Sequence, residues 1–461
     1  MKTSTFLPNF DRLEDRLTPA TSAPVAVGNV LASVSAGLLT ITGDALVNGI
    51  DITQTGFKQF TVFSFFGSVN GGPNKIFVAD NVTSMAISLG GGDDILSFEA
   101  LQAPMLIAGN VSISMGSGID AVNMNPGIGN AISIFGNLSI TNGAGACENI
   151  LSDVNVGGAA TFNHAAGGDS RLFIQGFVGV NSFKSLSVAN GIGNDTVRIS
   201  DTNFSGSVAI SNGQGGLLGG DTSVSLLAGG SANLLSIGGS LAVSTSSGHA
   251  TFAVSDYNVS GNVSMTQLGG TASNFVGIED GPTLTGLTPI FKGNVAITST
   301  GQNPFVELGS AGTPFTIKGG VAINLANSTG NTFVRLDDLA SAGNASATGG
   351  ISIATGSALD SINLDDVGTG SNFRGAVTIS TGSGNDSLTI DGVAAGTTFF
   401  RSLNANLGAG DDSLRLANNS LVNFLGSAVL NGGATDLNNT VVEAPANFGG
   451  TFQPRLIHFH P

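Results

Sequence analysis

Short stretches of this chain alternate between apolar and polar residues with a period of two. The segments Val111-Ser-Ile113-Ser-Met115 and Val377-Thr-Ile379-Ser are apolar at every second position. A strand with one buried face requires this alternation, because successive side chains point to opposite sides of a sheet. Glycine-rich turns separate the stretches, and no segment keeps the apolar period of a helix over three turns. The pattern predicts an all-β protein made of many short strands.

The strands recur at a nearly constant interval. We take as an anchor the first apolar strand position after each Gly-Asn, Gly-Ser or Gly-Gly step. Successive anchors lie 22 to 33 residues apart, and 26 is the commonest interval. Such a repeat is typical of a solenoid whose coils stack on one another. The anchors are Met85, Val111, Leu138, Ala160, Leu186, Val208, Leu241, Val263, Val295, Val321, Ile351, Val377, Leu403 and Ala428.

A second interval divides each coil. From eight anchors the next strand's first apolar residue lies 11 positions further on, and Leu39 and Ile50 share this spacing, so we expect an entry coil to begin before residue 40. Hairpin meanders also produce alternating strands, but the coil length favours a parallel β-helix. We expect a right-handed helix, because parallel crossovers are overwhelmingly right-handed. The prediction is about 14 coils of roughly 26 residues, forming a rod on the order of 70 Å long.

The same reading divides the chain and assigns structural roles. We expect a leader at residues 1–24, the solenoid at 25–440 and a C-terminal tail or cap at 441–461, with the least regular coils between about 208 and 295.

Asparagines that follow glycine in stacked corners should form hydrogen bonds along the rod. They include Asn110, Asn137, Asn262 and Asn294. Phenylalanines at strand positions should fill the interior. They include Phe98, Phe252, Phe305 and Phe333.

Composition narrows the class of protein. Apolar residues make up 41% and charged residues 10% of the chain, so it can bury a core and is unlike a disordered chain. The net charge is −16, and no cluster of Lys and Arg predicts a nucleic-acid partner. No apolar run reaches the length of a membrane helix. The lone Cys147 excludes an internal disulfide and is interpreted as a small turn residue, and the four histidines lack zinc-ligand spacing.

One turn motif carries possible chemistry. Five turns have the pattern Gly-x-Gly-x-Asp-x-apolar, and a sixth lacks the second glycine. Their aspartates are Asp94, Asp120, Asp195, Asp360, Asp386 and Asp412. The motif resembles one unit of the hemolysin-type (RTX) calcium-binding repeat, although that family repeats its unit every nine residues and this chain has one unit per coil. The resemblance implies Ca²⁺ held by these carboxylates and by turn carbonyls.

The structural alternative to calcium is turn stabilisation, and we favour it. Aspartate accepts hydrogen bonds from turn amides and tolerates turn conformations. The spacing of 26 residues between Asp94 and Asp120, and along Asp360, Asp386 and Asp412, predicts that these side chains stand in register on neighbouring coils. Their mutual repulsion, about 1 kcal/mol per pair in water, is tolerable at a solvated corner.

A second resemblance concerns location. The run from Leu13 to Ala20, Leu-Glu-Asp-Arg-Leu-Thr-Pro-Ala, is similar to the LE-x-R leader of planctomycete extracellular repeat proteins. The resemblance implies export and a secreted or cell-surface location. It covers only a short part of the chain and implies no activity.

These observations predict a non-enzymatic extracellular or cell-envelope protein of structural or adhesion type, whose partners are surface or matrix components or further copies of itself. The alternative is a polysaccharide lyase or glycosidase on a β-helix. Such enzymes need clustered acids and aromatic sugar platforms, whereas this chain has no Trp and a single Tyr. Glu279-Asp280 is the best acidic pair within an insertion. We therefore assign no catalytic residue.

Overall fold

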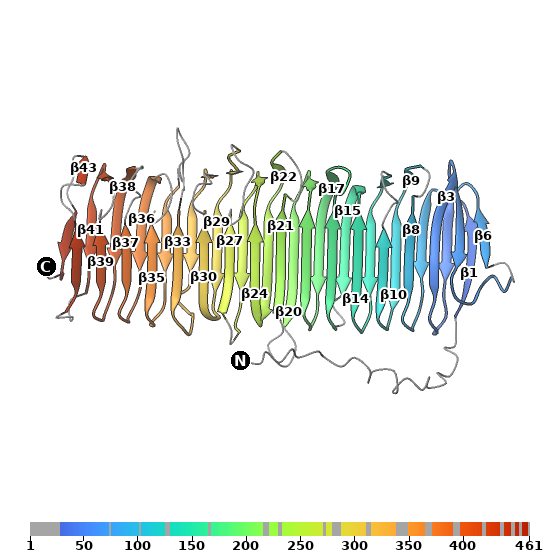
Figure 1. Cartoon of the computed structure of the whole chain (residues 1–461), viewed down its shortest axis with the longest axis horizontal. Coiled ribbons are helices and arrows are strands. Elements are labelled where there is room, and N and C mark those ends of the chain that lie inside the picture. The colour runs from blue at the N-terminus through green and yellow to red at the C-terminus, as the bar shows by residue number, and fades with distance from the viewer. Residues whose placement is uncertain are drawn as a thin grey trace, which may run out of the picture.

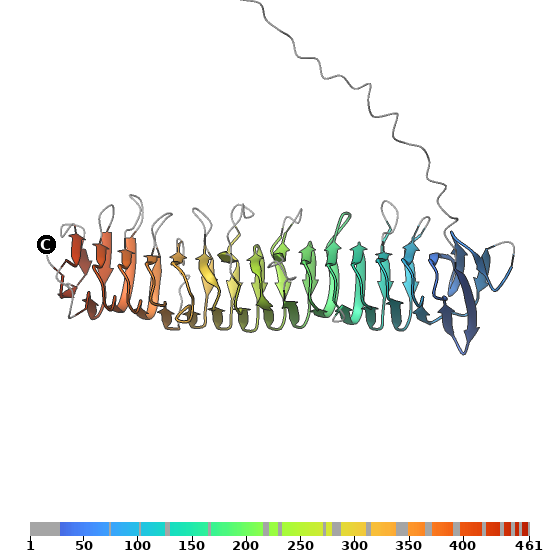
Figure 2. The same cartoon turned by 90° about the horizontal axis from the view of Figure 1, so that it is seen from below.

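The protein is an elongated stack of parallel strands, seen side-on in Figure 1 and from below in Figure 2. No helix occurs in the residues that the structure describes, so the predicted all-β parallel solenoid is confirmed. The computed structural model describes residues 28–72, 75–100, 103–124, 130–164, 167–214, 221–228, 233–270, 273–278, 287–309, 315–337, 349–364, 371–390, 397–416, 421–433, 438–443, 448–450 and 454–459.

The coils contribute strands to three faces, which we call A, B and C in chain order. Face A contains β2 (Leu38–Thr42), β7 (Ser84–Ser88), β10 (Val111–Gly116), β13 (Leu138–Asn142), β20 (Val208–Gln214), β23 (Leu241–Ser247), β26 (Val263–Gln267), β29 (Val295–Ser299), β32 (Val321–Asn324), β34 (Ile351–Ala354), β41 (Ala428–Asn431) and β44 (Arg455–Ile457). Face B contains β3 (Gly49–Gly56), β8 (Ile95–Glu99), β11 (Asp120–Met124), β14 (Cys147–Ser152), β16 (Ser170–Gln175), β18 (Asp195–Ser200), β21 (Asp221–Leu227), β24 (His249–Val254), β27 (Ser273–Ile278), β30 (Gln302–Leu308), β33 (Thr332–Leu336), β35 (Asp360–Leu364), β37 (Ser387–Ile390), β39 (Ser413–Leu416) and β42 (Thr440–Glu443).

Face C is built from shorter strands, and four long strands bend from face C into face A. Face C contains β5 (Ser68–Val69), β9 (Met105–Ile107), β12 (Ile132–Ile134), β19 (Thr202–Phe204), β22 (Leu235–Ile237), β25 (Tyr257–Val259), β28 (Ile290–Phe291), β31 (Thr316–Ile317), β40 (Leu421–Phe424) and β43 (Phe448–Gly450). The long strands are β15 (Val154–His164), β17 (Asn181–Asn190), β36 (Asn372–Ser380) and β38 (Thr397–Asn406). A register shift marks the bend in β15, between Val156 and Ala159.

Face A contains every anchor that the sequence predicts, and each anchor pairs with the next from Met85 to Ala428. The ladder stays in register through the irregular coils between residues 208 and 295. Leu39 pairs with Met85, and Ile50 pairs with Leu96, which confirms the entry coil. Additional residues therefore lie between strands and do not shift the pairing.

The N-terminal end departs from the parallel pattern. Here β1 (Asn29–Ser35) pairs antiparallel with β2, and β4 (Gln59–Ser64) lies antiparallel between β3 and β6 (Ile76–Ala79). Excluding hairpins on coil length was wrong for this end: the turn between β1 and β2 precedes Leu39, and the long interval between Leu39 and Met85 accommodates β4 and β6. Buried Phe60 and Val62 on the inner side of β4 cover the first coil of the core. At the opposite end, β43 and β44 add strands that pair with β40 and β41.

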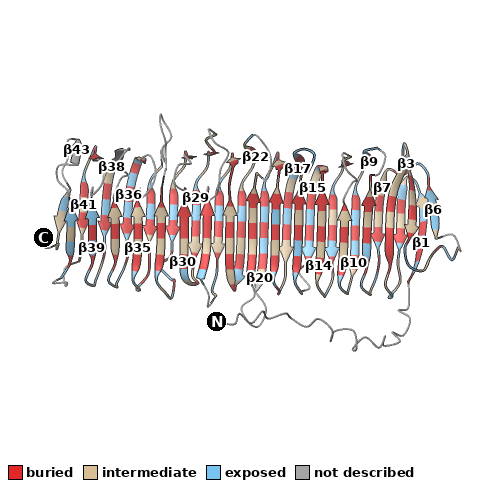
Figure 3. Ribbon diagram, viewed as in Figure 1, coloured by how far each residue is buried: buried red, intermediate tan, exposed pale blue. Residues whose placement is uncertain are grey.

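Inward side chains alternate with outward ones along the strands, and Figure 3 shows this as alternating buried and exposed bands. Phe98 and Phe252 are fully buried, as predicted. Phe305 and Phe333, which we expected in the interior, are half-buried on the outside of face B. The inward neighbours are Val306 and Val334, one position along. The prediction was wrong because it rested on the aromatic residue alone, whereas the alternate set that contains it also contains Glu307 in β30 and Arg335 in β33.

The outward phenylalanines form a stack along the rod. The ring centroid of Phe305 lies 5.4 Å from that of Phe275 and 4.7 Å from that of Phe333. Asparagine stacking is also confirmed, in the corner between faces C and A. The amide of Asn137 donates to Oδ1 of Asn110 at 2.9 Å, and the amide of Asn294 donates to Oδ1 of Asn262 at 2.9 Å. Hydrogen bonds in the corners, outside the strands, thus also connect successive coils.

Candidate functional site at the corner between faces A and B

The glycines of the repeated motif are required by close stacking of the backbone. Gly116 has φ of 94°, and a Cβ on it would lie 1.4 Å from the carbonyl oxygen of Gly90. Gly118 has φ of 144°, and its Cβ would lie 2.0 Å from the oxygen of Gly92. No side chain fits such contacts, and glycine adopts these φ values without strain. The two glycines of the motif are therefore explained by the fold.

The turn carbonyls take part in hydrogen bonds between coils. The amide of Ser117 donates to the oxygen of Gly90 at 3.1 Å, and the amide of Gly92 donates to the oxygen of Ser117 at 2.9 Å. Equivalent bonds join Gly382 and Ala409 near the other end of the rod. These oxygens face amides of the neighbouring coil.

All six motif aspartates lie inside the corner. Their exposed fractions are 0% for Asp94, Asp195 and Asp360, 1% for Asp386 and Asp412, and 3% for Asp120. The expectation of a solvated corner was wrong. Each aspartate stands two positions before an inward apolar residue, so strand alternation points it inward as well. The sequence shows this two-residue spacing, so the inward direction of the aspartates could have been predicted.

The aspartates stand in register, as their spacing predicts, and each receives an amide from the preceding coil. Asp94 donates its amide to Oδ1 of Asp120 at 3.1 Å. The amide of Asp360 donates to Oδ1 of Asp386 at 2.9 Å, and that of Asp386 donates to Oδ1 of Asp412 at 2.8 Å. The favoured interpretation, turn stabilisation, is consistent with these bonds, but the amides come from a neighbouring coil and not from the same turn.

The aspartates belong to a longer line of buried residues, which we call the polar corner column. It begins at Asn48, whose amide donates to Oδ1 of Asp94 at 2.7 Å, and ends at Asn439, whose Oδ1 accepts the amide of Asp412 at 2.7 Å. Paired neighbours fill the coils between the aspartates. They include Cys147, Ser170, Thr222, Ala250 and Thr332. Sequence reasoning missed these members because they do not carry the motif.

Burial dominates the electrostatics of this column. It raises the pKa of Asp94 and of Asp195 from 3.8 to about 6, and it also raises the pKa of Asp120 and of Asp386. In Asp94, Asp195 and Asp386 the second carboxyl oxygen, Oδ2, has no hydrogen-bond partner among the described residues. The carboxyl groups of Asp94 and Asp195 therefore take up a proton at about pH 6, well above their ordinary range.

The donor set does not meet the needs of Ca²⁺, which takes six to eight oxygen ligands. Each coil supplies at most one inward carboxyl group to the column, and the turn carbonyls face amides. Among the described residues, no group of three or more His, Cys, Asp and Glu side chains is placed to hold a metal. Calcium binding at the six aspartates stays a prediction that titration can test.

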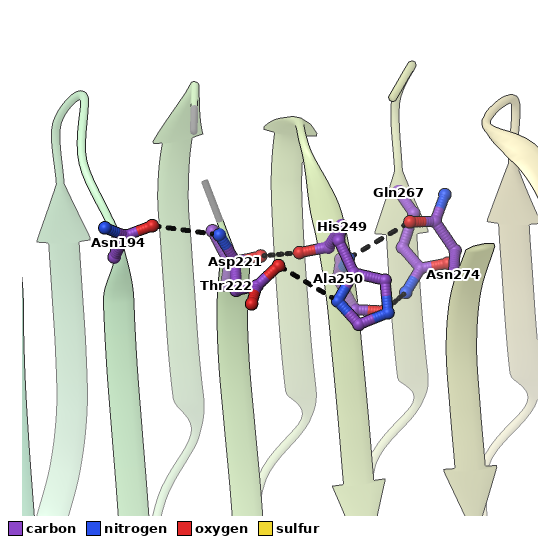
Figure 4. Close-up of polar contacts among 7 residues, drawn as sticks. All are labelled: Asn194, Asp221, Thr222, His249, Ala250, Gln267 and Asn274. Atoms are coloured by element: carbon purple, nitrogen blue, oxygen red, sulfur yellow. Dashed lines mark hydrogen bonds and ion pairs between the residues drawn. The ribbon is translucent and has the colours of Figure 1, made fainter. Parts of the chain in front are cut away.

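In several coils the residue before the inward member of the polar corner column is an exposed Asp or Asn, and its side chain bonds in the opposite direction along the rod. Oδ1 of Asp93 accepts the amide of Ile119 at 2.8 Å. Oδ1 of Asp169 accepts the amide of Asn194 at 2.9 Å, and Oδ1 of Asn194 accepts the amide of Asp221 at 3.0 Å (Figure 4). Consecutive residues of one turn therefore connect their coil to both neighbours.

The irregular middle of the rod contains an exposed acid–histidine pair. Nδ1 of His249 lies 3.2 Å from Oδ1 of Asp221, and their side chains are 37% and 80% exposed (Figure 4). Two further bonds hold Ala250, the residue after His249. Oδ1 of Asn274 accepts the amide of Ala250, and Nε2 of Gln267 donates to the carbonyl oxygen of Ala250. An exposed pair of this kind adds little stability. The acidic pair Glu279-Asp280 lies outside the described residues.

No protein-family model matches this chain. No curated protein and no solved structure matches it either. The described residues contain no helix long and apolar enough to cross a membrane. The function is therefore argued from the geometry of the chain itself.

Cys147 is buried, and it forms a pair that sequence reasoning missed. Its Sγ lies 2.9 Å from Nδ1 of His164, whose Nε2 lies 3.0 Å from the carbonyl oxygen of Gly167. Burial raises the pKa of the thiol to about 12 and lowers the pKa of the imidazole. The thiol donates to Nδ1, and Nε2–H donates to the carbonyl, which we assign from these partners. A protonated, buried thiol is a poor nucleophile.

Proposed function

We propose that this protein is a non-enzymatic extracellular or cell-surface rod with a structural or adhesive role. The observation that supports the proposal most directly is the unbroken ladder on face A, which keeps its register from Leu39 to Ala428. The repeated Gly-x-Gly-x-Asp motif also serves this ladder, because its glycines permit stacking and its aspartates bind amides of adjacent coils. The repeated glycines and aspartates of the chain thus contribute to stacking of the coils.

An elongated repeat surface suits contact with many copies of a partner. Repeat proteins present extended surfaces whose contacts recur from coil to coil. The proposed partners are surface or matrix components or further copies of the rod. The proposed location rests on the leader-like run from Leu13 to Ala20, which lies outside the described residues.

The test combines location with turnover. Protease treatment of intact cells of the producing organism should remove the protein, and removal only after lysis would refute the surface location. The purified chain is incubated with acidic and neutral polysaccharides, and released reducing ends and unsaturated products are measured. The proposal predicts no release above a heat-denatured control. Clear turnover would establish the alternative, a polysaccharide lyase or glycosidase.

A further inference from the structure

Four basic side chains that are far apart in the sequence lie at the corner between faces C and A, as two pairs on adjacent coils with the coil of Ile351 between the pairs. Each is the first residue after the last inward residue of a face C segment. The amide of Lys292 donates to the oxygen of Val259, and the amide of Lys318 donates to that of Phe291, which places the two lysines at equivalent positions. Arg374 and Arg401 directly follow a pair of buried phenylalanines that are in register. All four residues are exposed, and we call them the basic column.

The basic column is unusual in this chain, which has 15 basic residues and a net charge of −16. It borders the C-terminal half of face A, whose strands β29, β32, β34, β36, β38 and β41 contain no Asp or Glu. Outward residues of these strands carry mainly hydroxyl, amide or small side chains, such as Thr298, Asn324, Ser352 and Thr378. A line of cations thus lies beside a neutral face rich in hydrogen-bonding groups.

A cavity lies at the C-terminal end of the column. Asn372, Phe373, Arg374, Arg401 and Leu425 line it, and its volume is about 420 Å³. The two arginines follow residues paired on adjacent coils, so their like charges are close neighbours. An anion in this cavity can contact both arginines, and the planar guanidinium groups match the geometry of a carboxylate or sulfate.

We propose that the basic column binds an acidic polysaccharide that lies along the rod. Carboxylate or sulfate groups contact the cations, with the arginine cavity as the strongest position, and sugar hydroxyls contact the neutral face A. This inference rests on the proposed function and names the class of its partner. Local attraction operates despite the net charge, because charges farther away than about 8 Å are largely screened at physiological salt.

Two other polyanions fit the column less well. Double-stranded DNA carries one charge per about 1.7 Å of axis, roughly three for each coil spacing of about 4.8 Å. The column offers at most one cation per coil, and none in the coil of Ile351, because no Lys or Arg occurs between Arg335 and Arg374. A second copy of the rod would have to present carboxylates, but the exposed carboxylates of Glu148 and Asp221 on face B already face Arg171 and His249. Acidic sugars carry sparser charges on a flexible chain, which suits both the spacing and the cavity.

The test measures binding of the full chain to polygalacturonate, dextran sulfate, neutral dextran and an oligo-dT strand. We expect both acidic polysaccharides to bind at about 50 mM NaCl, to weaken at about 500 mM, and to exceed neutral dextran. The double variant Arg374→Gln, Arg401→Gln should raise Kd about tenfold or more. The matched control, Arg171→Gln with Arg198→Gln, makes the same charge change on face B and should alter Kd by less than about twofold.

Each other outcome overturns the inference. Equal binding of neutral dextran, or equal loss in the two double variants, would refute recognition by the basic column. Tighter binding of oligo-dT through Arg374 and Arg401 would assign the column to nucleic acid. Concentration-dependent association of the protein alone, abolished by the column variant, would assign it to a second copy. Absence of any binding refutes only the inference, whereas turnover in the same mixtures refutes the proposed non-enzymatic function.

Discussion

Acidification should stabilise this protein through the polar corner column, and Asp195 is the clearest position for testing this. Its carboxyl group is buried, Oδ1 accepts the hydroxyl of Ser170 at 2.6 Å, and Oδ2 has no hydrogen-bond partner among the described residues. Burial penalises the charged form and raises the pKa from 3.8 to about 6. The native state therefore binds a proton more tightly than the unfolded chain does. The stabilisation from this residue is fully present below pH 3.8 and is lost as pH rises through about 6.

The magnitude follows from the difference between the two pKa values. A shift of about two units corresponds to roughly 3 kcal/mol in the free energy of unfolding. The Asp195→Asn variant keeps an acceptor oxygen and removes the titration. Asparagine already occupies this column at Asn48 and Asn439, so the substitution suits the site. The stability of the wild type relative to the variant should fall by up to about 3 kcal/mol between pH 4 and pH 7.

Urea midpoints measured in steps from pH 4 to pH 8 provide the assay. His164, whose pKa is lowered by burial, opposes the effect, because its unfolded form gains a proton below about pH 6.5. Comparing wild type with Asp195→Asn cancels that contribution. Asp80→Asn, at an exposed position near the N-terminal end of the rod, controls for the change in net charge. Parallel pH profiles for wild type and Asp195→Asn would refute the reasoning.

Three further predictions concern the same corner. Gly116→Ala should destabilise by about 3–5 kcal/mol because of its backbone clash and positive φ, whereas Gly179→Ala, which has open space around its Cβ, should change stability by less than about 1 kcal/mol in urea unfolding. The buried thiol of Cys147 should react with a thiol reagent only after unfolding, and rapid labelling of the native protein would contradict its burial. Millimolar Ca²⁺ should leave the melting temperature unchanged, and a rise that Asp386→Asn abolishes would establish the calcium hypothesis.

Much of the fold could be predicted because a solenoid repeats one local rule. The anchors required only strand alternation and a recurring glycine step, and every anchor proved to be in register. The hairpins at the N-terminal end do not follow the repeat, so the interval could not reveal them. Phe305 was misplaced because it was assigned to the core as an aromatic residue, whereas the alternation of Val306 with Leu308, against Phe305 with Glu307, places Val306 inward. The 11-residue step from Val295 to Val306 did predict that Val306 points inward.

The candidate site was only partly visible in the sequence. The spacing predicted the register of five of the six aspartates. Each aspartate also stands two positions before an inward apolar residue, which would have predicted its inward direction. The pairing of Cys147 with His164, and the alignment of Lys292 with Lys318, depend on how coils of unequal length stack. The residues of each pair are separated by turns of variable length, so no local motif predicts that they lie close together. Their contacts are properties of the stacked rod and not of any short segment.

Distances between spin labels test the register of the stack most directly. Labels are placed on outward face A positions of a Cys147→Ser background, at Ser112 with Ala242 and at Ser112 with Thr378. These pairs are separated by five and ten ladder steps. At about 4.8 Å per step, the account predicts narrow distributions near 24 Å and 48 Å, apart from the reach of the labels. Broad distributions, or distances that do not double between the pairs, would contradict it.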